Sequence, residues 1–275
     1  MQPTEPALIT AADRLPEPRV RLATGYHGTV ELDHASRLVC KTYHAPDGGE
    51  LAQQEFDRLT HFSRAIADQP FITCPTPDHV DIAAGQLWMT FCDGDRLNNI
   101  LYRSGALSDN DIDHIANQIA ISFVRYVEVL NEPVYDPGLW NMLYNSSTRV
   151  LCLLDFADPA GKIGAATDVS PLDVTLGEFV GRSTFDTIRP ATCMNGYYAR
   201  SQRRIATIVL QAVRARMAVQ PNTITTVADL AYRRHAWFGV LRRDLWFRTV
   251  GRMLYRRRSR SIVQQAMHDN ELRQA

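Results

Sequence analysis

The chain has 275 residues, of which 45% are hydrophobic and 22% are charged, and its formal net charge at pH 7 is zero. This length accommodates one large domain or two smaller lobes around a cleft, and the composition excludes the disordered and fibrous classes. No run is apolar enough to span a membrane, and the N-terminus lacks the basic start and apolar core of a secretory signal. The five cysteines form no C-x-x-C pair, so we expect reduced thiols in a cytoplasmic protein rather than a zinc site.

The charge is unevenly distributed along the chain. Residues 231–275 hold eleven arginines and three acidic residues, a net charge of +8, so the remainder carries −8. Lysine occurs only at Lys41 and Lys162, and all other strong cations are arginines. The position of each lysine is therefore informative.

A glycine turn between two strands is predicted near the N-terminus, after a flexible lead-in over residues 1–18. Residues 20–32 are typical of a strand, a turn with Gly25 and Gly28, and a second strand, and residues 37–43 form a further strand that carries Lys41. Glycines let backbone N–H groups approach a phosphate closely, although a plain hairpin explains the pattern too. A half-buried lysine needs a partner, and the alternative is a lysine facing solvent on an edge strand.

Two amphipathic helices are predicted on either side of a second hairpin. Residues 50–66 form the first helix, which carries Glu55, and residues 109–130 form the second helix, capped by Ser108 or Asp109. Between them, residues 80–83 and 86–91 pair as strands and end in a polar turn after Phe91 and Cys92.

Residues 134–159 contain the polar residues on which the functional prediction depends. Two short apolar runs, 142–144 and 150–154, flank a polar turn and predict a hairpin. Asp136 and Asn141 precede this hairpin and Asp155 follows it, so the three side chains converge at its open end. Carboxylate and carboxamide oxygens suit Mg²⁺. The alternatives are a chance triple, or Asp and Asn acting only as turn formers and caps.

The C-terminal half is predicted to be helical. A helix opens near Asp168, another covers residues 197–218, a break follows at 221–226, and residues 227–265 form a basic, aromatic-rich helical region. The first interpretation of residues 227–265 is a set of helices that pack on the preceding helices and expose a basic face to solvent. Peripheral membrane contact through residues 231–260 is the second alternative, and nucleic-acid contact is the least favoured.

Taken in chain order, these motifs resemble the protein-kinase-like phosphotransferases, nearest to the bacterial aminoglycoside-phosphotransferase and lipopolysaccharide-kinase type. The resemblance covers roughly residues 20–182, and it depends most on Asp136, Asn141 five residues later, and Asp155 in a D-F-G-like segment. It implies that Asp136 orients and deprotonates the attacking hydroxyl. It also implies that Asn141 and Asp155 hold Mg²⁺.

The same resemblance assigns the upstream residues to ATP. Gly25, Gly28 and Val30 fall on the second and third glycines and the valine of G-x-G-x-x-G-x-V, with Ala23 at the first glycine position. Lys41 would reach the phosphates and pair with Glu55, with Glu50 as the fallback. Backbone groups at Phe91 and Cys92 would meet the adenine, and Asp168 would hydrogen-bond the catalytic loop.

The implied fold is α+β and two-lobed, with a small antiparallel-sheet N-lobe containing one main helix and a larger, mostly helical C-lobe. The lobes would cover residues 19–92 and 93–222, followed by a basic helical extension over 223–275. Three departures concern the fine structure of the site: Val134 replaces a histidine, Tyr135 replaces a glycine or arginine, and Ala157 replaces the glycine of D-F-G.

The predicted function is an ATP- and Mg²⁺-dependent kinase that acts on a hydroxyl of a small-molecule or lipid-linked sugar acceptor. The alternatives are a pseudokinase or nucleotide-binding scaffold acting through the Arg-rich C-terminal helix, and a protein Ser/Thr kinase. We expect a cytoplasmic location, with the inner membrane surface as the alternative if the basic tail binds lipid. The acceptor itself is not encoded in any motif.

Overall fold

The computed structural model describes residues 19–24, 28–103, 105–134, 136–157, 169–188, 195–238 and 251–274. By their internal contacts the residues form two compact units, one of Met1–Gln53 with Pro77–Phe91 and one of Gln54–Thr76 with Cys92–Ala275. One boundary lies between Phe91 and Cys92, the pair expected at the hinge. Gln54–Thr76 groups with the second unit, whereas the sequence predicts these residues within the first lobe.

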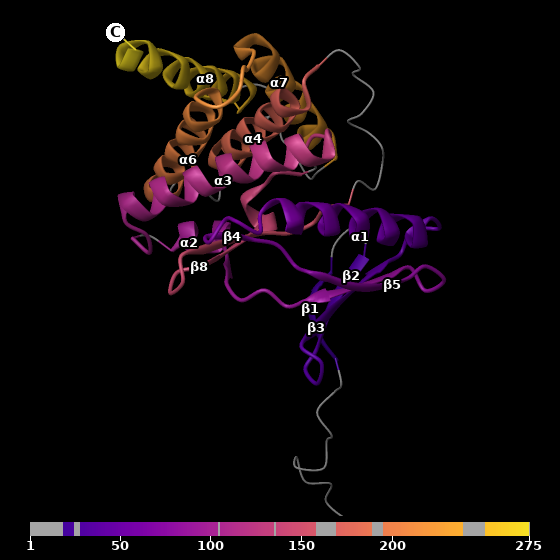
Figure 1. Cartoon of the computed structure of the whole chain (residues 1–275). Coiled ribbons are helices and arrows are strands. Elements are labelled where there is room, and N and C mark those ends of the chain that lie inside the picture. Colours follow the sequence, from indigo (N-terminus) through magenta and orange to yellow (C-terminus); the bar gives the residue numbers. More distant parts are fainter. Residues whose placement is uncertain are drawn as a thin grey trace, which may run out of the picture. The chain divides into compact units, whose positions relative to one another are not determined.

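The first unit is built on a five-stranded antiparallel sheet in the order β1-β2-β3-β6-β5 (Figure 1). The strands are β1 (Arg19–Thr24), β2 (Gly28–Asp33), β3 (Leu38–Tyr43), β5 (Pro77–Asp81) and β6 (Gln86–Thr90). Buried Val39, Leu87 and Met89 lie on one face of the central strands β3 and β6, because Val39 pairs with Met89 and side chains two residues apart on a strand share a face. Helix α1 (Gly48–Ala65) begins in this unit and ends in the second.

The second unit combines a small sheet with a bundle of helices. Its four strands, in the order β4-β9-β8-β7, are β4 (Ile72–Thr73), β9 (Val150–Leu153), β8 (Met142–Asn145) and β7 (Asp95–Arg96). The helices are α2 (Leu97–Tyr102), α3 (Asp109–Leu130), α4 (Pro171–Ile188), α6 (Gly196–Arg214), α7 (Pro221–Phe238) and α8 (Arg252–Gln274). Helices α3, α4 and α6 lie side by side in Figure 1 and pack on one another.

Helix α3 has the predicted bounds, and its sequence explains both ends. Ser108 accepts a hydrogen bond from the Asp111 amide and the Asp111 side chain accepts one from Ser108, which forms a capping box. Asn131 ends the helix in the left-handed conformation, which asparagine tolerates better than most residues.

Helices α7 and α8 pack within the second unit, α7 against α4 and α8 against α6 (Figure 1). Gly177 and Gly181 of α4 make the close approach of α7 possible, since a Cβ at Gly177 would clash with Val227 and one at Gly181 would crowd Ala231. The arginines at 242, 243 and 248 of the predicted basic region lie outside the described residues.

The predicted α+β class, with an antiparallel-sheet N-terminal region and a mostly helical C-terminal region, is confirmed. The predicted break over 221–226 is wrong. The chain turns at residues 215–220, and Pro221 starts α7, because a helix leaves the first backbone N–H groups unused and proline lacks one. No helix in the described ranges has the length and apolar character to cross a bilayer.

Candidate active site

The predicted hairpin exists as β8 and β9, and it places Asn141 beside Asp155 along the backbone. Met142 pairs with Leu153 at the open end of the hairpin. One residue further out, the Leu154 amide donates a 2.8 Å hydrogen bond to the carbonyl oxygen of Asn141. The sheet pairing therefore continues to the residue before Asp155.

Both candidate aspartates have left-handed backbone conformations. The φ angle is +47° at Asp136 and +62° at Asp155. Such angles cost an ordinary L-residue roughly 1–2 kcal/mol, and aspartate and asparagine are among the few that adopt them routinely. Unusual backbone conformations persist only where the surrounding structure holds them in place, and they are common at functional sites. Asp136 and Asp155 meet this description.

The carboxylate of Asp136 is held by two side chains. Trp140 donates its indole N–H to Oδ2 at 3.1 Å, and the Arg182 guanidinium lies 3.0 Å from Oδ1. The same guanidinium stacks over the Trp140 ring, 5.0 Å from its centroid. Arg182 comes from α4 and Trp140 from the 3₁₀ turn Leu139–Asn141, so two elements fix the orientation of Asp136.

The side chain of Asn141 is oriented by the same loop. Its Nδ2 donates to the backbone oxygen of Asp136 at 3.0 Å, which leaves the Oδ1 atom as the ligand atom available to a cation. No group of three or more His, Cys, Asp or Glu suited to a metal is found within the described part of the chain. The donor set of one carboxamide and one carboxylate nevertheless fits Mg²⁺, which keeps several waters and shares phosphate oxygens.

Helix α1 holds the backbone of Phe156, the residue after Asp155, from both sides. Glu55, which is only 1% exposed, accepts the Phe156 amide hydrogen at Oε1 over 2.9 Å. Arg58, one turn later, donates to the Phe156 carbonyl at 3.2 Å and pairs with Glu132 at 2.9 Å. The segment that carries Asp155 is therefore tied to α1 and to the start of the Asp136 loop.

The Phe156 ring is buried in an aromatic cluster. Its centroid lies 5.2 Å from that of Phe62 in α1 and 5.7 Å from that of Tyr126 in α3. These tilted contacts bury apolar area and fix the ring. Together with the α1 contacts, they fix the position of Asp155 through its neighbour.

A threonine of α4 contacts the loop before Asp136. Thr175 accepts the Val134 amide hydrogen at 2.9 Å and donates its own hydroxyl hydrogen to the Pro171 carbonyl, also at 2.9 Å. This loop contact is the role that the resemblance assigned to Asp168, a residue outside the described part of the chain. Tyr135, one of the three departures, also lies outside it.

The predicted phosphate-binding residues belong to the first unit. Val30 and Lys41 are register partners on β2 and β3, and the Lys41 ammonium lies 5.0 Å from the centre of the Tyr43 ring. A Cβ at Gly28 would clash with the Thr42 carbonyl, so strand packing alone already requires this glycine. Gly25 lies outside the described residues. The expected ion pair between Lys41 and Glu55 joins different units and stays a prediction.

The two predicted hinge residues differ in their surroundings. Phe91 extends β6 of the first unit and donates its amide hydrogen to the Arg37 carbonyl at 3.3 Å. Cys92 belongs to the second unit, where a hydrogen bond with Cys152 holds the pKa of the Cys92 thiol below its usual value. Burial, together with Cys92, raises the pKa of Cys74 to about 12.

Four residues of the site were missed from the sequence: Arg58, Trp140, Thr175 and Arg182. Arginine is the common cation of this chain, so neither Arg58 nor Arg182 stood out as the two lysines did. Trp140 lies inside the predicted motif and could have been noted as a donor. Thr175 carried no signal, because a helical threonine is ordinary.

Comparisons with known proteins give little beyond this geometry. No protein-family model matches the chain, and no curated protein matches it. Two crystal structures of the Mycobacterium tuberculosis PknI kinase domain, a single and a double mutant, align with 78% of this chain and with 93% and 94% of theirs. Each is 20% identical to this chain, with TM-scores of 0.42 and 0.43. At this level of similarity, the function must be inferred from the residues of the chain itself.

Proposed function

We propose that this chain is an ATP- and Mg²⁺-dependent kinase that transfers a phosphoryl group to a hydroxyl of a small-molecule or lipid-linked sugar. The observation that carries the proposal is the hairpin end, where Asn141 is hydrogen-bonded to the Asp136 backbone and joined to the residue before Asp155. Asp136 and Asp155 both have the left-handed backbone there. The hydrogen bonds of Asn141 therefore connect the Asp136 loop with the residue before Asp155.

In the proposed reaction Asp136 accepts the proton of the acceptor hydroxyl. Its carboxylate must point at the hydroxyl, and Trp140 and Arg182 supply that orientation. Asn141 and Asp155 would hold Mg²⁺, which when bound neutralises the charge on the phosphates. The contribution of the chain is mainly positioning, because phosphoryl transfer requires little covalent chemistry from the protein.

The class of the acceptor is inferred from the sequence. The interval between Asp155 and Asp168 contains no A-P-E-like stretch and is too short for a long regulatory activation segment. A short segment favours a small acceptor over a regulated protein-kinase substrate. The basic C-terminal region supports a lipid-linked acceptor.

One observation favours a pseudokinase as the second candidate. Both oxygens of the Asp136 carboxylate already have partners, Arg182 at Oδ1 and Trp140 at Oδ2. A base engaged in this way is less available to a hydroxyl proton. A pseudokinase would bind nucleotide and transfer no phosphate.

A thermal-shift titration with ATP and Mg²⁺ tests the nucleotide site. A ligand that binds only the folded protein stabilises it and so raises its melting temperature. At a ligand concentration about one hundred times the Kd, this stabilisation is about 2.7 kcal/mol. We expect a metal-dependent shift in the wild type that Asp155→Ala abolishes. Asp155→Asn keeps the left-handed backbone and separates loss of the ligand charge from backbone effects. Asp95→Asn, at an exposed surface ion pair with Arg103, is the matched control and should leave the shift unchanged.

Turnover then separates the kinase from the pseudokinase. We expect transfer of labelled phosphate from ATP to a sugar or a lipid-linked sugar, lost in Asp136→Asn. Nucleotide binding with no transfer to any acceptor in the screen would favour the pseudokinase. Autophosphorylation that disappears in Asp136→Asn would instead indicate a protein Ser/Thr kinase. No thermal shift at millimolar ATP would refute both nucleotide-binding candidates.

A further inference from the structure

A continuous groove follows the line where α3 and α6 pack, and it shares no residue with the candidate active site. Three hollows of 590, 380 and 420 Å³ line up along it. The first two share Asp113, Ile208 and Gln211, and the last two share Arg216. We call it the α3–α6 groove; it lies between the Asp109–Glu128 face of α3 and the 197–216 segment that contains most of α6.

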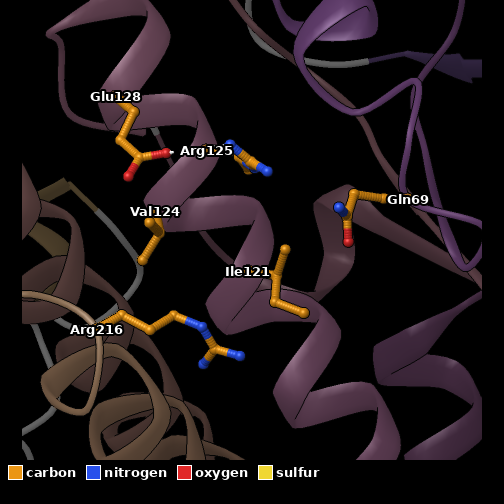
Figure 2. A pocket seen from close by; sticks show the side chains of 6 residues that line it. All are labelled: Gln69, Ile121, Val124, Arg125, Glu128 and Arg216. Carbon is orange, nitrogen blue, oxygen red and sulfur yellow. Dashed lines mark ion pairs between the residues drawn. The ribbon is translucent and has the colours of Figure 1, made fainter.

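The groove has the length and the apolar surface expected of a peptide-binding site. The α3 positions that line it extend over about 29 Å at 1.5 Å per residue, which an extended peptide of about nine residues would cover. Half-buried Ile121 and Ile208 supply apolar surface. Figure 2 shows one end, where Ile121 and Val124 project from α3 and the Arg216 side chain reaches into the same space.

The acidic residues of the groove are already paired. Arg204 of α6 lies 3.0 Å from Asp109 and 2.5 Å from Asp113 of α3. At the other end, the ion pair drawn in Figure 2 joins Arg125 and Glu128 at 3.6 Å. These carboxylates therefore do not balance any further arginine.

The groove also contains arginines that have no carboxylate partner in the described part of the chain. Arg200 and Arg203 are exposed on α6, one turn apart, and they make no hydrogen bond or ion pair with any described residue. The guanidinium of Arg216 donates to the Ala212 carbonyl at 2.9 Å and has no ion pair with a described residue. The uncompensated charge of the groove is therefore positive along its whole length.

A buried hydroxyl in the groove gives a second, independent indication of a ligand. Thr207 is only 6% exposed, lines the largest hollow, and its Oγ1 has no hydrogen-bond partner. A buried polar group without a partner destabilises a protein by about 1–3 kcal/mol. A bound ligand that hydrogen-bonds to Thr207 would remove this penalty.

We propose that the α3–α6 groove binds a short acidic, amphipathic segment of a partner protein in extended form. Its carboxylates would take the planar guanidinium groups of Arg200 and Arg203 as partners, and its apolar side chains would cover Ile208 and Ile121. A nucleic acid fits less well, because its phosphate backbone offers no apolar side chains to cover half-buried Ile208 and Ile121. The proposal does not depend on the kinase function.

Selection from a displayed library of random ten-residue peptides tests the proposal with the whole protein as bait. We expect the enriched peptides to carry a net negative charge and apolar residues. In fluorescence anisotropy, labelled versions should bind at least about tenfold more weakly to Arg200→Glu/Arg203→Glu than to the wild type. The salt dependence of binding should decrease in the same variant.

Matched controls make the result specific. Arg257→Glu/Arg260→Glu on α8 introduces the same charge change at exposed arginines outside the groove, and it should alter affinity by less than about twofold. Ile208→Ser tests the apolar contact and should weaken binding. If circular dichroism shows that the charge reversal prevents folding, Arg200→Gln/Arg203→Gln replaces that variant in the binding assay.

Three results would overturn the proposal. The first is an enriched set with no acidic bias, or no enrichment at all. The second is an equal loss of affinity in the α8 control, which would indicate a general charge effect. The third is equal binding of a peptide whose Asp and Glu are replaced by Asn and Gln.

Discussion

Substitutions of Glu55 test two roles of its side chain. One is the ion pair expected from the sequence, and the other is the hydrogen bond present in the structure. The resemblance assigns Glu55 to an ion pair with Lys41, which requires its charge. The structure shows a buried Glu55 that accepts the Phe156 amide hydrogen at 2.9 Å, which requires only an acceptor oxygen. Glu55→Gln keeps an acceptor of the same shape and removes the charge, whereas Glu55→Ala removes both.

The expected magnitudes follow from burial. Glu55→Ala leaves the Phe156 N–H without its acceptor and opens a small cavity, so it should destabilise this segment by about 2–4 kcal/mol. Glu55→Gln should cost less than about 1 kcal/mol. Because each 1.4 kcal/mol is about a factor of ten, Glu55→Ala should accelerate exchange of the Phe156 amide by roughly 30- to 1,000-fold.

Hydrogen exchange followed by mass spectrometry, on a peptide covering residues 151–157, measures this effect locally. Global denaturation would mix the responses of the two units. Exchange that changes less than about threefold in Glu55→Ala, or equally in both variants, would refute the hydrogen-bond account. If Glu55→Gln keeps slow exchange and loses the ATP-dependent thermal shift, the charge of Glu55 serves the nucleotide site as well.

The other predictions concern α4. Thr175→Val leaves the Val134 amide without its acceptor and should lower the free energy of unfolding by about 1–3 kcal/mol in denaturant titrations, whereas Thr175→Ser should be nearly neutral. Arg182→Met should lower kcat roughly tenfold or more with little change in the Kd for ATP, because it releases the Asp136 carboxylate; an unchanged kcat would exclude a positioning role. Burial raises the pKa of Asp173, so its ionised form destabilises the folded state above pH 3.8. Asp173→Asn should therefore raise the melting temperature at pH 7, and its advantage should shrink as the pH falls towards 3.8; a difference that stays constant down to pH 3.8 would contradict this.

Periodicity predicted most elements of the fold. The bounds of α3 and the β8–β9 hairpin follow the apolar pattern closely, because each element buries one regular face and has a polar cap or turn at its end. The start of α7 was not predicted, because proline breaks a helix at interior positions but is also favoured at the first position of a helix. The assignment of Gln54–Thr76 to the second unit could not be predicted, since it depends on tertiary contacts of α1 and β4.

The sequence predicted proximity only where chain order brings residues together. Asp136, Asn141 and the residue before Asp155 are connected at one hairpin, so the local pattern sufficed to predict their proximity, and their functional role stays a prediction. Arg182 reaches Asp136 from α4, and Glu55 reaches Phe156 from α1, across a long separation in sequence. Such contacts depend on how helices pack, which periodicity does not specify. The α3–α6 groove was missed for the same reason, because it exists only where two helices meet.

The division of α1 between the two units has a consequence for the order of folding. The first unit is interrupted in sequence, and β6, which lies between β3 and β5 in its sheet, ends at Thr90. Strands β1, β2 and β3 can pair locally as soon as they leave the ribosome, but the sheet cannot be completed before Thr90 has been synthesised. By then all of α1 is available, including the half that packs in the second unit. A nascent chain stalled near residue 76 would therefore hold an unpaired β3 edge, the kind of exposed strand that chaperones protect from aggregation.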